Sequence, residues 1–192
     1  MSRFVPTASQ TVGPFFHFAL NRPEWSDLAA DGAAGTRIRI AGRVLDGDRA
    51  PVADAFLEIW QADASGRFDH EEDRRDGRAD GRFRGFGRCF TDAEGRFAFT
   101  TIKPGRVPGR GNALQAPHVG VTIFARGLLH HLTTRLYFAD EAAANASDPV
   151  LGAIDDAAAR ATLIAALEAG TPPTYRFDVV LQGAGETAFL DV

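Results

Sequence analysis

Hydrophobic and polar residues alternate in several short runs along the chain. In residues 37–46, RIRIAGRVLD, arginines alternate with aliphatic residues, which is the period of a strand with one buried face. The run AFLEIWQAD from Ala55 is apolar on both faces, as in a central strand that is covered on each side. Because DGDRAPV between the two runs is a turn sequence, they predict a hairpin.

The remaining pattern predicts further strands and one helix. FGRCFTDAEGRFAFTTIKPG predicts a second hairpin that turns at Asp92 to Gly95, and strands are predicted at 118–126, 133–139 and 175–182. Residues 155–170, DDAAARATLIAALEAG, predict a helix with acidic residues in its first turn and Gly170 as its C-cap. The charge and glycine content of residues 64–85 indicate an exposed loop.

Short strands joined by tight turns, with a single helix in the C-terminal half, predict a mainly β fold, namely a β-sandwich. We expect one domain over residues 37–192, preceded by an extended N-terminal segment, residues 1–36, whose pattern assigns no element. A length of 192 residues, with 45 % hydrophobic and 24 % charged residues, fits an ordinary globular protein with one core.

Charge and cysteine content narrow the possible partners and compartments. The net charge of -4 creates no field that would attract nucleic acid. The chain has no apolar run near the ~20 residues that span a bilayer, and it begins without the pattern of a secretory signal. Its one cysteine, Cys89, cannot form an internal disulfide, and we interpret it as a small buried hydrophobe. We therefore expect a cytoplasmic protein without nucleic-acid or membrane partners.

The histidines are the candidate nitrogen ligands for a metal: His17, His70, His118, His130 and His131. The adjacent pair 130–131 would point to opposite faces of a strand and could not share a metal. His70 stands in an acidic stretch that favours a solvated loop, and His17, between two phenylalanines, favours a packing or hydrogen-bonding role. Nucleophile and phosphate-loop motifs are absent from the sequence, so these patterns leave the function open.

Four stretches together resemble one family: GRVLDGDRAPVADAFLEIWQADASGRF, FGRCFTDAEGRFAFTTIKPG, APHVGV, and TRLYF followed by YRFDVVLQG. They are similar to the intradiol ring-cleavage dioxygenases, which open catechols between the two hydroxyl-bearing carbons with a non-haem ferric ion. The match runs from residue 37 to 183 in order. It implies the β-sandwich that the alternation also predicts.

The resemblance also implies that this chain has lost the iron ligands. Catalytic members of the family hold ferric iron with two tyrosines and two histidines, a set suited to an ion of high charge. Those four positions here are Phe68, Val107, His118 and Gly120. His118 alone keeps a donor atom among them, so the resemblance implies no metal on this chain.

One member of the family consists of two homologous subunits, α and β, of which β carries the iron. The stretches SQTVGPFF, FARG, HLTTRLYF and QGAGETAFLDV resemble its α subunit. This implies a hetero-oligomer of αβ units in which the homologous β subunit holds Fe(III) and the arm of residues 1–36 packs on that partner. It further implies that the α chain has no catalytic residue by itself, and that Thr11, Gly13, Pro14 and Arg126 line the pocket of a small aromatic substrate.

Two alternatives stay open at this point. The chain could be a self-sufficient enzyme that binds another metal through His118 together with His70 or His131. It could also be a stand-alone β-sandwich that serves as a binding or carrier module.

Overall fold

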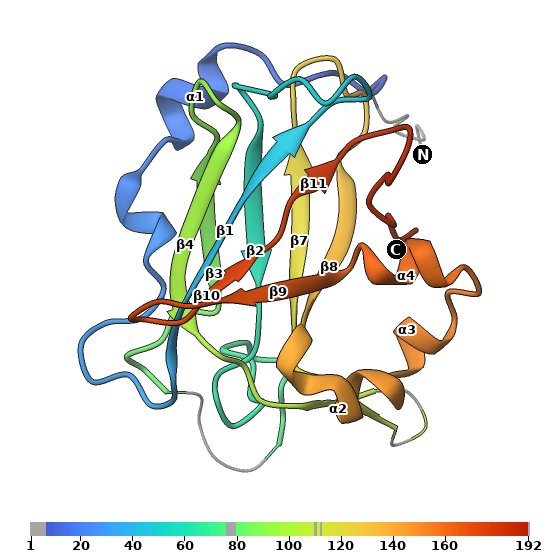
Figure 1. Ribbon diagram of the computed structural model, residues 1–192. Helices are drawn as coiled ribbons and strands as arrows, with labels where there is room; N and C mark the ends of the chain where they lie inside the picture. Colours follow the sequence, from blue (N-terminus) through green and yellow to red (C-terminus); the bar gives the residue numbers. More distant parts are fainter. Residues whose placement is uncertain (1–6, 76–79, 110, 112, 192) are drawn as a thin grey trace, which may run out of the picture.

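The computed structural model describes residues 7–75, 80–109, 111 and 113–191, and over these residues the fold is mainly β (Figure 1). The strands are β1 (Arg37–Leu45), β2 (Phe56–Trp60), β3 (Phe86–Phe90), β4 (Arg96–Ile102), β5 (Val107–Pro108), β6 (Leu114–Gln115), β7 (His118–Phe124), β8 (Leu132–Phe138), β9 (Ile164–Glu168), β10 (Thr174–Arg176) and β11 (Val179–Val180). The helices are α1 (Phe15–Leu20), α2 (Ala142–Ala146), α3 (Pro149–Gly152) and α4 (Ala157–Ala161), with 3-10 turns at Pro23–Ser26 and Ala139–Glu141.

The long strands form two layers. One layer runs β3-β2-β7-β8 with antiparallel pairing. The other contains β4, β1, β10, β11 and β9, and it crosses in front of the first layer in Figure 1. Parallel pairing of β8 with β9 joins the two layers at one edge. The predicted β-sandwich is therefore confirmed.

The core lies between the layers because each strand alternates its side chains. In β1 the isoleucines and Val44 are buried while the arginines face solvent, and in β7 every second residue is buried. The two inner faces together form one cluster that includes Leu57, Ile59 and Phe99. Burial of a large apolar side chain contributes roughly 1.5 to 3 kcal/mol relative to exposure, so this alternation fixes which face of each strand turns inward.

Both predicted hairpins are wrong in their pairing, although their turns form. Asp92 accepts backbone hydrogen bonds from Glu94 and Arg96 through Oδ1, as a tight turn requires. The strands on either side of each turn nevertheless separate: β1 pairs with β4, and β2 pairs with β3 and β7. The chain crosses from one layer to the other at each turn because both flanking strands have an apolar face to bury against the other layer.

The predicted helix at 155–170 is correct only in its first part. Helix α4 begins after Asp156, whose carboxylate caps the amide of Ala158, and it ends at Ala161. The residues after it form β9, which pairs with β8 and β10. Gly170 does not cap a helix, because the residues before it form the strand β9, which ends at Glu168. Pairing with the two neighbouring strands therefore outweighs the helix propensity of these residues.

The strand predicted at 175–182 is divided into β10 and β11, and Gly42 explains the break. Both segments pair with β1, and the carbonyl oxygen of Phe177 lies between them. A Cβ atom on Gly42 would lie 1.7 Å from that oxygen, so only glycine allows this approach. Strands β7 and β8 match their predicted ranges to within two residues.

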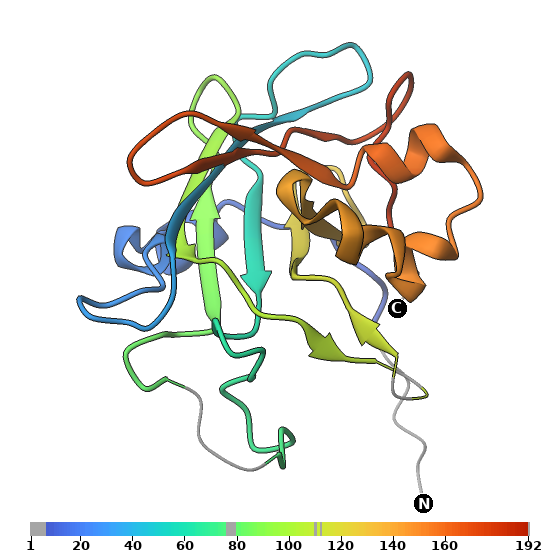
Figure 2. The ribbon, with the colours of Figure 1, turned by 60° about the horizontal axis from the view of Figure 1, so that its bottom comes forward.

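The predicted loop at 64–85 is irregular in residues 64–75 and 80–85, and its residues 76–79 lie outside the described part. Helices α2, α3 and α4 are grouped beside β9 (Figure 2). Between them and the sandwich lies a second apolar cluster that contains Tyr137, Leu151 and Leu163. In the described residues no helix is long and apolar enough to cross a membrane.

The N-terminal segment lies against the sandwich from residue 7 onward. Leu28 is buried in the main core, and the ring of Phe16 in α1 stacks on Phe56 of β2 at 5.8 Å between centroids. Residues 1–6, which belong to the predicted arm, lie outside the described part.

Candidate site: a replaced metal centre and an open pocket beside the N-terminal arm

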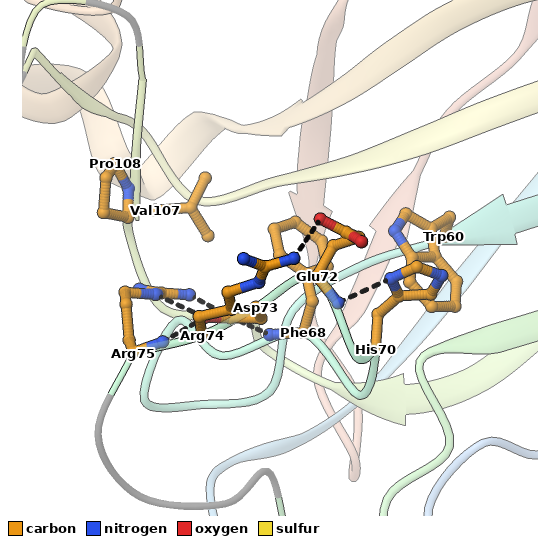
Figure 3. Close-up of a pocket in the computed structure, with 9 residues that line it drawn as sticks. All are labelled: Trp60, Phe68, His70, Glu72, Asp73, Arg74, Arg75, Val107 and Pro108. Atoms are coloured by element: carbon orange, nitrogen blue, oxygen red, sulfur yellow. Dashed lines mark hydrogen bonds and ion pairs between the residues drawn. The ribbon is translucent and has the colours of Figure 1, made fainter.

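Two of the positions that the resemblance aligns with iron ligands, Phe68 and Val107, line one cavity of about 750 Å³, which we call the Phe68 pocket (Figure 3). Its described lining is Trp60, Phe68, His70, Glu72, Asp73, Arg74, Arg75, Val107 and Pro108. Phe68 and Val107, which are distant in sequence, thus lie on the same cavity.

Phe68 follows β2 in the loop that begins at residue 61. Its ring lies parallel to that of Trp60, with 5.9 Å between centroids and 7° between planes. Its amide donates a hydrogen bond of 2.9 Å to Oδ2 of Asp73. The ring that a tyrosine would carry is therefore held in place by stacking, but it lacks the oxygen that would bind a metal.

Asp73 and Arg75 brace this loop. Arg75 donates to both carboxylate oxygens of Asp73, through Nε at 2.7 Å and through Nη2, and Nη2 also donates to the carbonyl of Gly66. The hydrogen bond from Arg75 holds the pKa of Asp73 well below its usual range, against the opposing effect of burial. The carboxylate of Asp73 and the guanidinium of Arg75 at this wall are therefore paired with each other.

Val107 belongs to β5 and stands opposite Phe68. It pairs with Gln115 of β6, and its side chain is buried. Figure 3 shows Val107 and Pro108 on the far wall of the Phe68 pocket, away from the loop of His70 to Arg75. Two branched methyl groups offer no donor atom to a metal.

His118 and Gly120 lie on the outward face of β7, as their spacing predicts. Nδ1 of His118 lies 2.8 Å from the carbonyl oxygen of Ala116. Burial lowers the pKa of His118, and the positive charge of Arg135 lowers it further. Gly120 is opposite Arg135 in β8 and Trp60 in β2.

These residues do not fit a ferric ion. The four positions supply one imidazole, and Arg135 brings a positive charge to it where a bound cation would be repelled. In the described ranges no three histidine, cysteine, aspartate or glutamate residues are grouped as a metal site requires. His70 instead lies edge-on to Trp60, and His131 contacts Phe124, so neither is grouped with His118. The alternative of a self-sufficient metalloenzyme has no support in this geometry.

The four predicted pocket residues meet at the other end of β2 and β7. Gly13, Pro14 and Arg126 line one cavity of about 450 Å³, which we call the arm pocket. Its lining is Val12, Gly13, Pro14, Phe16, His17, Phe18, Asp54, Phe56, Phe90 and Arg126. Thr11 fixes the arm beside it, because its Oγ1 accepts a hydrogen bond of 2.8 Å from the amide of Gly127, the residue after Arg126.

Aromatic rings form the floor of the arm pocket. Phe56 stacks on Phe124 at 4.5 Å and lies 5.1 Å from Phe90, while Phe16 covers Phe56 from the arm. His17 lies edge-on to Phe90 and contacts Asn21 through Nε2 at 3.0 Å, which is the packing and hydrogen-bonding role its sequence context favours. The floor is rigid and apolar, as suits an aromatic ligand.

Arg126 and the outer face of α1 remain accessible. Nε of Arg126 lies 3.0 Å from Oδ2 of Asp54, and 79 % of the arginine side chain is exposed. In α1, Phe15 and Phe18 are each 80 % exposed. Sequence reasoning missed Asp54, Arg135 and these two rings, because the contacts of Asp54 and Arg135 depend on strand pairing that no local pattern contains.

Comparisons with known proteins agree with this geometry. A family model described as Dioxygenase matches residues 13–183. The chain is 45 % identical to the protocatechuate 3,4-dioxygenase alpha chain of Burkholderia cepacia over the whole of both chains. It is 40 % identical to the beta chain from the same organism, over 80 % of this chain and 67 % of that one. The solved dioxygenase domain of a dioxygenase carbohydrate-binding protein fusion from Streptomyces sp. SirexAA-E has a TM-score of 0.60 at 29 % identity, covering 94 % of this chain and all of that one.

The β-sandwich and the family match over residues 13–183 define a protein of the non-haem iron dioxygenase class. The chain belongs to the intradiol ring-cleavage dioxygenases, a family that uses non-haem ferric iron.

Proposed function

We propose that this chain is the alpha subunit of a protocatechuate 3,4-dioxygenase and completes the substrate pocket of a homologous, iron-bearing beta subunit. The observation that carries the proposal is the arm pocket, where Gly13, Pro14 and Arg126 line one open cavity. The full-length similarity to an alpha chain of that name supports it. Three of the four ligand positions lack a donor atom, so we assign the Fe(III) to the partner.

The assembled enzyme would add both atoms of O2 to 3,4-dihydroxybenzoate and open its ring to 3-carboxy-cis,cis-muconate. The ferric ion of the partner supplies the binding of the two catechol oxygens and the activation of the ring toward O2. This chain supplies shape and charge at the other end of the substrate.

Arg126 is the group that recognises the substrate's carboxylate. A guanidinium offers paired N–H donors that match a carboxylate, and the pair strengthens when water is excluded. Gly13 and Pro14 form the adjacent wall: no atom lies within 4 Å of a Cβ built on Gly13, so the backbone borders open space. Proline keeps that backbone stiff, which holds the wall in place without a side chain.

The partner surface that we propose is the outer face of α1. Phe15 and Phe18 expose large apolar rings next to the arm pocket. Aromatic residues are enriched in the cores of protein interfaces, and these two would be covered by the beta subunit. From residue 7 onward the arm packs on this chain's own sandwich. If the outer face of α1 also contacts the beta subunit, the arm bridges the two subunits.

A second candidate function is a stand-alone binding or carrier module derived from the family. The size of the Phe68 pocket, about 750 Å³, is the observation in its favour. Such a module would remain monomeric when produced together with a homologous beta chain, whereas an alpha subunit would form a complex with it. The cytoplasmic location expected from the single cysteine stays a prediction.

Replacement of Arg126 tests the proposed function. In the assembled enzyme, Arg126→Ala should lower kcat/KM for 3,4-dihydroxybenzoate about 10- to 100-fold, since a charged hydrogen bond contributes roughly 1.5 to 3 kcal/mol. Gel filtration should show unchanged assembly. Arg96→Ala, which replaces a half-exposed arginine at the start of β4, is the matched control and should leave both measurements unchanged. Unaltered kinetics of Arg126→Ala would refute the role of Arg126.

A further inference from the structure

We infer that Asp54 is a positioning residue that orients Arg126 toward the carboxylate of the substrate. The inference rests on the proposed function and deepens it, because it assigns a residue that determines specificity for carboxylated catechols. Asp54 and Arg126 line the same arm pocket, and Oδ2 of Asp54 lies 3.0 Å from Nε of Arg126.

The pairing of β2 and β7 explains why these two residues meet. The antiparallel register places Phe56 opposite Phe124, and continuing it by two residues beyond the ladder places Asp54 opposite Arg126. Both are turn residues just beyond the paired ends of the two strands, and they line the same cavity as the ring of Phe56. The paired ends of β2 and β7 therefore bring the acid and the arginine together.

The backbone of Asp54 is anchored although its carboxylate is half exposed. The next residue, Ala55, is fully buried, and its amide donates a hydrogen bond of 3.1 Å to Oγ1 of the buried Thr91. Oγ1 of Thr91 lies 2.8 Å from the carbonyl oxygen of Val52, to which it can donate. These two hydrogen bonds hold the backbone of residues 52–55 in place. The backbone that carries the Asp54 carboxylate is therefore fixed relative to Arg126.

The contact uses one edge of the guanidinium and leaves the other available. Asp54 meets Nε, and in the described part of the chain it is the one ion-pair partner of Arg126. The terminal Nη1 and Nη2 form the fork that binds a carboxylate through two parallel hydrogen bonds. A side chain that is 79 % exposed has many rotamers, and an anchor at Nε reduces the entropy lost when the fork binds a ligand.

Two opposing effects follow when Asp54 loses its charge. The substrate carboxylate is relieved of a neighbouring negative charge, which is a weak effect at a site that is 46 % exposed. The guanidinium loses its anchor, which weakens a contact made by two hydrogen bonds. We expect the second effect to dominate, because it acts on the hydrogen bonds themselves.

The experiment measures kinetics of Asp54→Asn, Asp54→Glu and Arg126→Ala in the assembled enzyme with 3,4-dihydroxybenzoate and with catechol, which lacks the carboxylate. Asp54→Asn should raise KM for 3,4-dihydroxybenzoate about tenfold, the loss of one good contact, with kcat within about twofold. Catechol kinetics should stay unchanged, and Asp54→Glu should recover part of the loss. Glu94→Gln, another exposed acid paired with an arginine, is the matched control.

The double variant Asp54→Asn/Arg126→Ala tests the positioning role of Asp54 separately from the proposed function. It should be no worse than Arg126→Ala, because an anchor has no effect once the anchored group is absent. If Arg126→Ala is impaired while Asp54→Asn behaves as Glu94→Gln, or binds the acid more tightly, the positioning role is wrong and the proposed function stands. If Arg126→Ala retains full activity or no complex forms, the proposed function fails, and the role of Asp54 fails with it.

Discussion

At the start of β7, Nδ1 of His118 lies 2.8 Å from the carbonyl oxygen of Ala116, which can only accept a hydrogen bond. Nδ1 therefore carries the proton and donates it. The ring also lies 5.6 Å from that of Tyr137, at the edge of the second apolar cluster. In this chain the imidazole connects β7 to the segment before it, so His118 contributes to the fold.

The lowered pKa of His118 makes stability depend on pH. The unfolded chain takes up a proton near 6.5, whereas the folded chain resists protonation because the ring is buried beside Arg135. Between the lowered pKa and 6.5 the unfolded state binds more protons, so stability falls as pH falls below about 6.5. His118→Asn keeps an amide donor near the place of Nδ1 and removes the titration.

Urea unfolding at pH 7.5 and pH 5.5 measures this effect. Between pH 7.5 and pH 5.5 the wild-type chain should lose more free energy of unfolding than His118→Asn, so the wild-type value minus the variant value should become smaller toward low pH. A difference that is independent of pH, or that becomes larger toward low pH, contradicts the assignment. His130→Asn serves as the control because His130 is exposed.

Single residues also show what the sequence could and could not predict about the site. The assignment of Phe68, Val107 and Gly120 to ligand positions rests on motifs that place each at a fixed distance from a strand or turn, and it stays a prediction. Asp54 was missed because its role depends on the register of β2 against β7, and residues 54 and 126 share no local pattern. Arg135 was missed for the same reason, since it meets Gly120 across a strand pair.

At the level of elements, local pattern predicted strand positions well and strand partners poorly. Alternation is a property of one strand, so β1, β7 and β8 were predicted close to their observed bounds. Pairing depends on the distribution of apolar faces between two layers, which no local window contains. The same limit explains β9, where the helix-forming residues of 164–168 complete a sheet between β8 and β10.

The exposed rings of helix α1 can be tested as the contact surface for the partner subunit. Replacement of Phe15 and Phe18 by serine should weaken the association of the two subunits, since each large apolar side chain contributes roughly 1.5 to 3 kcal/mol when it becomes buried. The melting temperature of this chain by itself should change little, because both rings are exposed in it.

Analytical ultracentrifugation of the mixed subunits measures the association. Leu167→Ser is the matched control, since this residue of β9 is 48 % exposed and lies in the other layer. Unchanged association of the Phe15→Ser/Phe18→Ser variant, or equal weakening by Leu167→Ser, contradicts α1 as the contact surface.

At the level of the whole molecule, the chain presents two cavities of different character on one β-sandwich. The Phe68 pocket contains Phe68, Val107 and paired charges, and the arm pocket contains Arg126 beside an apolar floor. Under the proposed function, the arm pocket is this chain's share of an active site whose iron is held by the partner. The family fold would then be retained while the chemistry belongs to that partner.

Iron content tests this central claim most directly. The chain is purified by itself and after co-expression with a homologous beta chain, and ferric iron is measured per polypeptide together with visible absorption from tyrosinate. We predict no bound iron on the chain by itself, and one ferric ion with that absorption for each αβ pair in the complex. Near-stoichiometric ferric iron with tyrosinate absorption on the chain by itself would contradict the account.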